Sequence, residues 1–336
     1  MADEKIGIVI YGCGVMGRRI AQALLSKKSF AIVGAVDVHP EIVGRDLGEL
    51  LEPARPIGVR VEKDAAALFG RVRARAVLHA TSSRLEAVHP QLAQCAEAGL
   101  DVVSTCEELS FPWKRHPERA REIDALARRQ DVTIVGTGIN PGYLMDTLPV
   151  FLTAPCLRVD SIRVTRMMNS ARRRVPFQEK VGTGLAPAQF REKISSGAIT
   201  GHVGLVESIQ LIGASLGWTF DEVRELPPEP VLAERETPSA LGPVAPGRVI
   251  GLRSVAYGLR SGARAVELEF CAHAAVAEEY DEVVIRGEPG LHQKILGGVH
   301  GDAGTVAMAV HTVPRAIAAP PGLRTMTELE VPRWVP

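Results

Sequence analysis

Cysteine is scarce in this chain, with five among 336 residues. No two cysteines have the C-x-x-C spacing of zinc sites and redox motifs, and no histidine and cysteine cluster has metal-ligand spacing, so we expect no metal. An odd number of scattered cysteines also argues against a disulfide framework. Such cysteine usage is typical of a reducing compartment, and we expect a cytoplasmic protein.

Net charge and long apolar runs are absent as well. The 39 Lys and Arg residues balance 39 Asp and Glu residues, which gives no electrostatic reason to expect nucleic acid or an anionic membrane as a partner. The one basic run, Arg172–Arg174, is typical of a solvated surface. No apolar stretch reaches membrane-spanning length, and the N-terminus lacks the form of a signal peptide, so we expect no membrane partner.

Hydrophobic residues are plentiful, at 46% of a chain whose length suits two domains. Over the first 145 residues, short β-branched runs alternate with helical patterns. The expected strands are residues 6–11, 30–36, 76–80, 100–104 and 132–135, and the expected helices are residues 16–25, 84–98 and 117–129. This alternation predicts right-handed crossovers and an α/β domain with a Rossmann-type parallel sheet.

The rhythm changes beyond about residue 150, where strands follow one another without a helix after each. Strands are expected at residues 161–167, 248–257, 265–274 and 282–286, and helices at 205–216 and 302–317. This pattern predicts an α+β domain with an open, mainly antiparallel sheet. The proline- and glutamate-rich residues 226–247 are interpreted as an exposed connection. We divide the chain into residues 1–145, residues 146–300, and a C-terminal helix and tail, residues 301–336, that packs back on the first domain.

A glycine motif follows the first expected strand and opens the first expected helix. In a G-x-G-x-x-G turn the first glycine makes the tight turn, the second lets the backbone approach a pyrophosphate, and the third lets helix and strand pack closely. The helix N-terminus then offers unpaired N–H groups to the phosphates. The cofactor-binding residues expected here are Gly12, Cys13, Gly14, Val15, Met16 and Gly17.

Asp37 ends the second expected strand, about 20 residues beyond the glycine motif, where an acid binds the adenosine ribose. A carboxylate there favours NAD, because it repels the 2′-phosphate of NADP. His39 and Arg45 follow closely and could hold that phosphate instead. We therefore expect NAD or NADP as the cofactor, and Asp37 favours NAD.

Polar loops follow two further expected strands, at the sheet edge where doubly wound folds bind ligands. Thr81 and Ser82 could line the cofactor path or equally cap the next helix. The glycine-rich loop 136–142 could let its backbone approach a flat ring. It contributes Asn140 to the expected cofactor site, and Thr137, Gly138 and Pro141 to the expected substrate pocket.

Two acids, Glu107 and Glu108, follow the strand at residues 100–104, again at the ligand edge. A carboxylate beside a nicotinamide can act as a general base or stabilise a cationic substrate such as an iminium. Acids in the first turn of a helix are also favoured by the helix dipole, which is the alternative interpretation.

With these residues identified, the chain resembles the 2,4-diaminopentanoate dehydrogenases and native amine dehydrogenases, whose N-terminal domain is akin to dihydrodipicolinate reductase. The matching segments span nearly the whole chain: GCGVMG (12–17), VDVHPEIVGRDLGEL (36–50), STCEEL (104–109), GTGINPGYLMD (136–146), GHVGLVES (201–208), GGVHGDAGTVAMAV (297–310) and PGLRTM (321–326). Sugar-type oxidoreductases with a similar first domain usually have Glu-Lys-Pro where this chain has Glu107-Glu108-Leu109.

The resemblance implies NAD(P)-dependent interconversion of an amine with a ketone or aldehyde plus ammonia. It implies that Glu108 is the key carboxylate and that the protein is a homodimer built through the second domain. We expect the neighbouring Glu107 in the substrate pocket. The substrate itself stays open: a small apolar carbonyl would need an apolar pocket, for which the candidates are Tyr143, Met145, Cys156, Met168 and Phe177.

Two alternatives remain from the sequence. A 2,4-diaminopentanoate dehydrogenase would act on an amino acid, whose carboxylate usually needs an arginine, and Arg166 and Arg172–Arg174 are candidates. A non-catalytic NAD(P) sensor would use the Rossmann domain alone, but such a sensor has no need of an acid beside the nicotinamide.

Overall fold

The computed structural model describes residues 5–336. The chain forms two compact units: the first contains the residues through Tyr143 together with Gly301–Pro336, and the second contains Leu144–His300. The chain thus passes from one unit to the other after Tyr143 and returns after His300. Within residues 5–336, no helix has both the length and the apolar character needed to cross a membrane.

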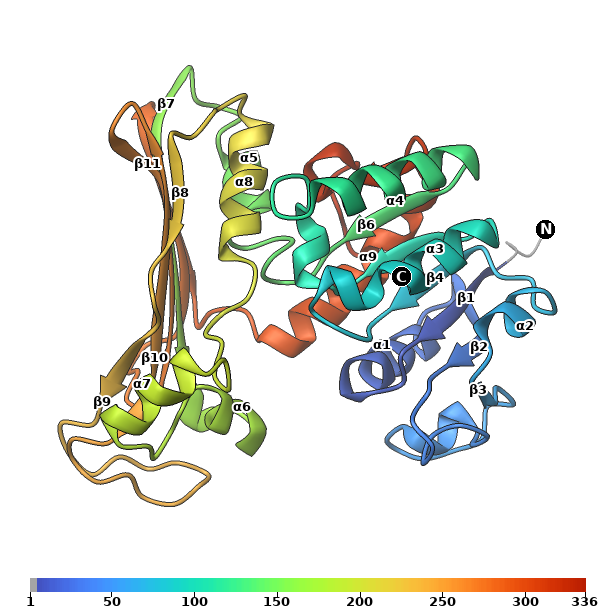
Figure 1. Ribbon diagram of the computed structural model, residues 1–336, viewed down its shortest axis with the longest axis horizontal. Coiled ribbons are helices and arrows are strands. Elements are labelled where there is room, and N and C mark those ends of the chain that lie inside the picture. Colours follow the sequence, from blue (N-terminus) through green and yellow to red (C-terminus); the bar gives the residue numbers. More distant parts are fainter. Residues whose placement is uncertain (1–4) are drawn as a thin grey trace. The chain divides into compact units, whose positions relative to one another are not determined.

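The first unit is built on a seven-stranded sheet in the order β14-β6-β5-β4-β1-β2-β3, in which all neighbours are parallel (Figure 1). Its strands are β1 (Ile6–Tyr11), β2 (Phe30–Val36), β3 (Val61–Glu62), β4 (Ala76–His79), β5 (Asp101–Ser104), β6 (Thr133–Gly136) and β14 (Gly322–Arg324). The predicted Rossmann-type sheet is confirmed, and the C-terminal strand β14 extends it beside β6.

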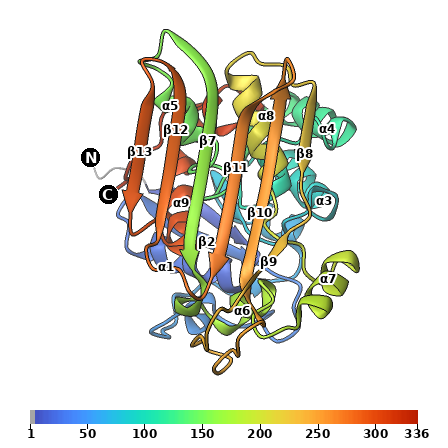
Figure 2. The same ribbon diagram turned by 90° about the vertical axis from the view of Figure 1, so that its left-hand side faces the viewer.

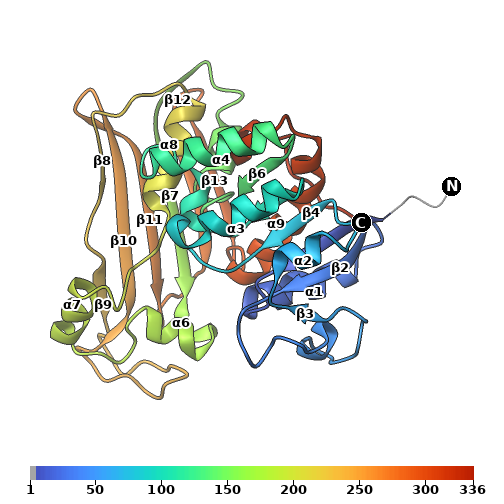
Figure 3. The ribbon, with the colours of Figure 1, turned by 45° about the vertical axis from the view of Figure 1, so that its right-hand side comes forward.

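Helices cover both faces of this sheet. They are α1 (Val15–Leu25), α2 (Ala65–Phe69), α3 (Leu85–Glu97), α4 (Pro117–Arg129) and α9 (Gly301–Ala318), with short 3₁₀ turns η1 (Leu47–Leu50), η2 (Glu107–Ser110) and η4 (Met326–Glu328). In β1, Ile8 and Ile10 pack in a core with α1 and α9, whereas Val9 packs in a second core with α3 and α4. Helices α3 and α4 lie side by side (Figure 3). Burial on both faces explains why these strands are continuous apolar runs.

The second unit is built on a mixed sheet in the order β13-β12-β7-β11-β10-β8, with β9 also paired to β10 (Figure 2). Its strands are β7 (Arg158–Asn169), β8 (Glu222–Glu225), β9 (Glu229–Leu232), β10 (Val249–Arg260), β11 (Ala263–His273), β12 (Tyr280–Glu288) and β13 (Leu291–Leu296). Only the β7–β11 pair is parallel among these pairings, so the predicted open, mainly antiparallel sheet is confirmed. Its helices are α5 (Thr147–Leu152), α6 (Val175–Lys180), α7 (Pro187–Ser195) and α8 (Leu205–Ser215), with the 3₁₀ turn η3 (Ser170–Arg172).

The two faces of this second sheet differ in chemistry. Val164 and Leu268 are buried on the face that α8 covers, where a Cβ on Gly258 would lie 3.0 Å from Ile209. Side chains that alternate with these point the other way and include Arg163 and Glu267. We call this second surface the open face.

The interpretation of residues 226–247 as an exposed connection was wrong in part. The segment contains β9, whose residues Glu229–Leu232 pair with β10, and a further bridge joins Thr237 to Val244. A proline- and glutamate-rich sequence forms a strand here because the long neighbour β10 offers unpaired backbone groups along its edge.

Candidate functional site

The glycine turn between β1 and α1 brings two stretches of backbone very close together. Gly12 has a φ of 95°, and a Cβ on it would lie 2.5 Å from the carbonyl oxygen of Ala80. A Cβ on Gly17 would lie 1.7 Å from the carbonyl oxygen of Gly12. Both positions therefore require glycine, in the roles that the motif predicts.

Gly14 differs, because a Cβ added there would meet nothing within 4 Å. It is the N-cap of α1, and no side chain caps that helix end. The N-terminus of an 11-residue helix thus opens onto empty space, as a pyrophosphate group requires. The neighbouring Cys13 side chain is turned into the core, where burial raises the pKa of its thiol to about 12, whereas Val15 is exposed and Met16 is half-buried.

Asp37 ties the end of β2 to the glycine turn. Its Oδ2 accepts a hydrogen bond from the backbone N–H of Cys13 at 2.6 Å, and its Oδ1 accepts one from the N–H of His39 at 2.8 Å. The carboxylate therefore lies beside the turn. His39 and Arg45 are exposed.

Thr81 lies next to the glycine turn, since a Cβ on Gly12 would be 2.9 Å from its methyl group. Its hydroxyl donates to Oε1 of Gln91 at 2.6 Å, while Ser82 accepts a hydrogen bond from the N–H of Arg84 at 3.2 Å. The N-cap of α3 is Arg84, so neither hydroxyl residue is the cap that the sequence offered as an alternative.

Glu108 is 3% exposed and makes three contacts. Its Oε1 accepts from Arg84 at 2.7 Å, and its Oε2 accepts from the N–H of Leu85 at 2.8 Å and lies 3.1 Å from Nε2 of His116. Burial alone would raise the pKa of this carboxyl, but the bonds from Arg84 and Leu85 outweigh it and hold the pKa below its usual value. Glu108 is thus a buried, ionised carboxylate at the N-terminus of α3. Glu107, the preceding residue, has a partly exposed side chain.

The missing side chain of Gly136 fixes the position of this acidic segment. A Cβ there would lie 2.5 Å from the backbone carbon of Leu109, so η2 can rest on the end of β6 only because that strand ends in glycine. The sequence analysis did not single out Arg84 or His116. They lie 24 and 8 residues from Glu108 in the sequence. Only the fold brings them together.

The loop after β6 is also tightly closed. A Cβ on Gly142, whose φ is 123°, would lie 2.4 Å from the backbone nitrogen of Gly138. Thr137 is 3% exposed, and its hydroxyl oxygen has no hydrogen-bond partner among the described residues. Pro141 is buried, Asn140 is half-buried, and Tyr143 packs against the core that contains α1 and α9. The unpartnered hydroxyl of Thr137 suits a ligand at this loop.

The candidates of the second unit have other surroundings. Met168 and Phe177 pack in one apolar cluster with Phe190, and Met145 is fully buried, whereas Cys156 is partly exposed. Arg166 is 2% exposed and lies 3.1 Å from Asp281. The arginine run is paired too: Arg172 and Arg173 lie 3.3 and 3.1 Å from Glu279. Within residues 5–336, no group of three His, Cys, Asp or Glu side chains could hold a metal ion.

Comparison with known proteins matches this chain over both units. A model described as 2,4-diaminopentanoate dehydrogenase C-terminal domain matches residues 143–335, and one described as dihydrodipicolinate reductase N-terminus matches residues 6–112. The 2,4-diaminopentanoate dehydrogenase of Acetoanaerobium sticklandii is 32% identical, and the alignment covers 99% of this chain and 95% of that protein. The chain belongs to the 2,4-diaminopentanoate dehydrogenase family.

Other relatives of this family member agree with the assignment. An amine dehydrogenase of Streptomyces virginiae is 24% identical over 95% of this chain and 94% of its own length. The solved structure of an amine dehydrogenase from Mycobacterium smegmatis superimposes with a TM-score of 0.84 at 30% identity, covering 99% of this chain and 98% of that one. The structure of GenD2 from gentamicin A biosynthesis in complex with NAD shares the fold, with a TM-score of 0.53 at 18% identity over 88% of this chain and 73% of that one. The family resemblance predicted from the sequence is confirmed, and the first unit has the fold of nicotinamide-dependent dehydrogenases.

Two of the three glycines of the motif, Gly14 and Gly17, offer a matched pair of variants that tests whether this family member binds the cofactor at the glycine turn. Gly14→Ala adds a methyl group to open space, so the protein should keep its melting temperature but lose most of its affinity for NADH. Gly17→Ala forces α1 away from β1 and should lower both. Thermal unfolding and fluorescence titration with NADH measure the two effects. Full NADH affinity in folded Gly14→Ala would contradict a pyrophosphate at this turn.

Proposed function

We propose that this protein is an NAD(P)-dependent amine dehydrogenase that converts a small ketone or aldehyde and ammonia into an amine, and catalyses the reverse reaction. The proposal rests on one observation. The ionised carboxylate of Glu108 and the glycine turn, which has space for a pyrophosphate at Gly14, follow strands of the same sheet at the same edge. An acid beside the nicotinamide and membership of a dehydrogenase family both favour an enzyme over a non-catalytic sensor.

In the proposed reaction, ammonia adds to the carbonyl carbon, and the loss of water together with the uptake of one proton gives an iminium ion. A nicotinamide cofactor, which the glycine turn and Asp37 would hold, would supply the hydride chemistry at this carbon in both directions. A carboxylate of η2 holds the nitrogen and stabilises the positive charge that the iminium carries. The glycine turn and Asp37 hold the cofactor, and the buried loop at Thr137 excludes water from the reacting atoms.

Glu108 is the residue we propose for this role, in line with the family resemblance. Arg84 and the N–H of Leu85 keep it ionised, which the role requires. The same contacts also let it stabilise the start of α3, so its replacement affects both charge and packing. Glu107, which is more exposed, is the competing acid.

The second unit favours an apolar carbonyl substrate over an amino acid. Arg166 is paired with Asp281 and donates to the carbonyl of Val299 at 2.6 Å. A substrate carboxylate would have to displace Asp281, and leaving a buried charge without its partner costs about 3–5 kcal/mol. The relative from A. sticklandii keeps 2,4-diaminopentanoate dehydrogenase as the second candidate. A spectrophotometric panel of amines and ketones with NADH and NADPH decides between them.

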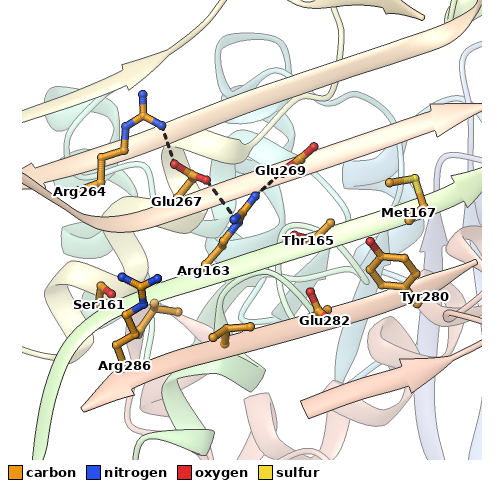
Figure 4. A pocket seen from close by; sticks show the side chains of 12 residues that line it. Ser161, Arg163, Thr165, Met167, Arg264, Glu267, Glu269, Tyr280, Glu282 and Arg286 are labelled. Carbon is orange, nitrogen blue, oxygen red and sulfur yellow. Dashed lines mark hydrogen bonds and ion pairs between the residues drawn. The ribbon is translucent and has the colours of Figure 1, made fainter. Parts of the chain in front are cut away.

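A homodimer through the open face is our proposal for the assembly. This face carries cations such as Arg163 and Arg286 and anions such as Glu267 and Glu282. Figure 4 shows Arg163 reaching Glu267 and Glu269 on the neighbouring strand, each at 3.3 Å. A surface with both signs of charge lets two copies related by a twofold axis pair opposite charges, and twofold symmetry is the commonest symmetry of oligomers.

One prediction concerns the proposed catalytic acid. Glu108→Gln should lower kcat for reductive amination by about 10²–10³-fold, while NADH affinity changes little, because the charge that stabilises the iminium is lost. Glu107→Gln is the matched control and should have a smaller effect. A larger effect of Glu107→Gln would reverse the roles of the two acids, and unchanged turnover in both variants would exclude the mechanism.

The pH profile of Arg84→Gln tests the same charge without touching the acid. Arg84 is half-exposed and holds the pKa of Glu108 below its usual value. Its removal raises that pKa, so Glu108 becomes protonated at a higher pH. As the pH is lowered, kcat/KM of the variant should therefore fall earlier than that of the wild type. Coincident acid limbs would count against an essential ionised Glu108.

The cofactor preference depends on Asp37 in our proposal. Asp37→Ala should weaken NADH more than NADPH, because only NADH offers a free 2′-hydroxyl to the carboxylate, and a hydrogen bond to a charged acceptor contributes about 1.5–3 kcal/mol. The loss of the bond to Cys13 affects both cofactors equally, so the ratio of the two dissociation constants is the quantity to measure. An unchanged ratio would remove Asp37 from the ribose site.

The dimer is tested by one charge in the open face. Val284→Glu lies across from Arg163 on β7, so a single copy tolerates it, but the new acid would be buried between two copies. Light scattering at micromolar concentration should give the mass of a dimer for the wild type and of a monomer for the variant. Leu241→Glu, at an exposed aliphatic position outside the sheet, should remain dimeric. A wild-type monomer overturns the proposal.

A further inference from the structure

His79, the last residue of β4, is a fully buried histidine for which the proposed reaction has no use. It lies in register with Ser104, the last residue of β5. The two residues thus stand at the carboxyl ends of neighbouring strands. The chain beyond His79 leads to Thr81 at the glycine turn, and the chain beyond Ser104 leads to the acids of η2.

Both ring nitrogens of His79 have partners. Nδ1 lies 2.9 Å from Oγ of Ser104, and Nε2 lies 2.7 Å from Oε1 of Gln91 and 3.0 Å from Oγ1 of Thr81. The Thr81 hydroxyl donates to the same Gln91 oxygen, and Oγ of Ser104 accepts a hydrogen bond from the N–H of Cys106 at 3.1 Å.

These partners fix the direction of every bond in the network. The amide oxygen of Gln91 can only accept, so Nε2 of His79 carries the hydrogen and Nδ1 is the acceptor. Ser104 then donates to Nδ1 while it accepts from Cys106. Burial lowers the pKa of His79 to about 4, so the ring is neutral near pH 7, as a ring that donates on one side and accepts on the other must be.

We propose that His79 is a positioning residue that joins the cofactor side of the site to the acid side. Its Nε2–H holds Gln91 and the Thr81 hydroxyl, and so sets the orientation of the Thr81 side chain, whose methyl group lies against the glycine turn. Its Nδ1 holds Ser104, and so sets the backbone at Cys106 from which η2 begins. This inference rests on the proposed function, because it takes Thr81 to line the cofactor path and η2 to supply the acid.

The two halves of the ring can be removed separately. In His79→Asn the side-chain oxygen takes the place of Nδ1 and keeps the bond from Ser104, but nothing replaces the donor to Gln91 and Thr81. In His79→Gln the amide nitrogen takes the place of Nε2 and keeps that donor, but the acceptor for Ser104 is lost. A histidine that only fills space would respond alike to both changes.

The experiment measures the dissociation constant of NADH by fluorescence titration and kcat at saturating NADH. His79→Asn should raise the dissociation constant about three- to tenfold, as expected for one lost hydrogen bond, and leave kcat near the wild-type value. His79→Gln should lower kcat by a similar factor and leave NADH binding nearly unchanged. Thr81→Val should match His79→Asn, and Thr81→Ser, which keeps the hydroxyl, should bind NADH as the wild type does.

His89→Asn is the matched control, because His89 is a half-buried histidine on α3, the helix that carries Gln91, and pairs with Glu122 at 3.1 Å. It should change neither quantity. Equal changes in both conservative variants, or no change in either, overturn the proposal. The titration decides the cofactor half of the proposal even if no amine or ketone is turned over, in which case it is the proposed function that fails.

Discussion

Two stretches of backbone approach each other at Gly12 and Gly17 more closely than any residue with a Cβ would allow. The arrangement of the first unit at its ligand edge depends on this contact. It lets α1 start directly beside the end of β1, and it leaves the space at Gly14 open. The carboxylate of Asp37, which follows the neighbouring strand β2, accepts a hydrogen bond from the N–H of Cys13. This bond also stabilises the turn.

A buried charge organises the neighbouring part of the same edge. Glu108 is almost fully buried and ionised, which is tolerable only because three groups surround its two oxygens. Those groups belong to the start of α3 and to the residue that precedes α4. Two sets of contacts therefore hold the loop after β4 and the segment after β5 together. One is made by the Glu108 carboxylate, and the other by the hydrogen bonds of His79. Contacts within the protein itself therefore hold this edge of the sheet together.

The sequence predicted the elements whose patterns are local. Residues 117–129 form α4 with the predicted bounds, since Pro117 suits the first turn of a helix. Strands β8 and β13 were not predicted, because EVRE and LHQKIL are polar edge strands that exist only through pairing with β10 and β12. The acids after β5 could be located, but their partners could not. Arg84 gives no local sign that it faces Glu108, and His79 ends an apolar strand like any core residue.

The same limit explains why the arginines were ambiguous until the fold was known. A sequence shows a cation and says nothing of its counter-ion, which for Arg166 lies on β12, more than a hundred residues further along the chain. Burial raises the pKa of the Asp281 carboxyl above its usual value, and the neighbouring Arg166 only partly offsets that rise. The opposite charges of Arg166 and Asp281 are paired with each other. Val299 also contacts both residues, since its carbonyl oxygen accepts from Arg166 and its N–H donates to Asp281. A charged group added to such a pair would leave one member without a partner. A neutral carbonyl compound, which we propose as the substrate, makes no such demand on the pair.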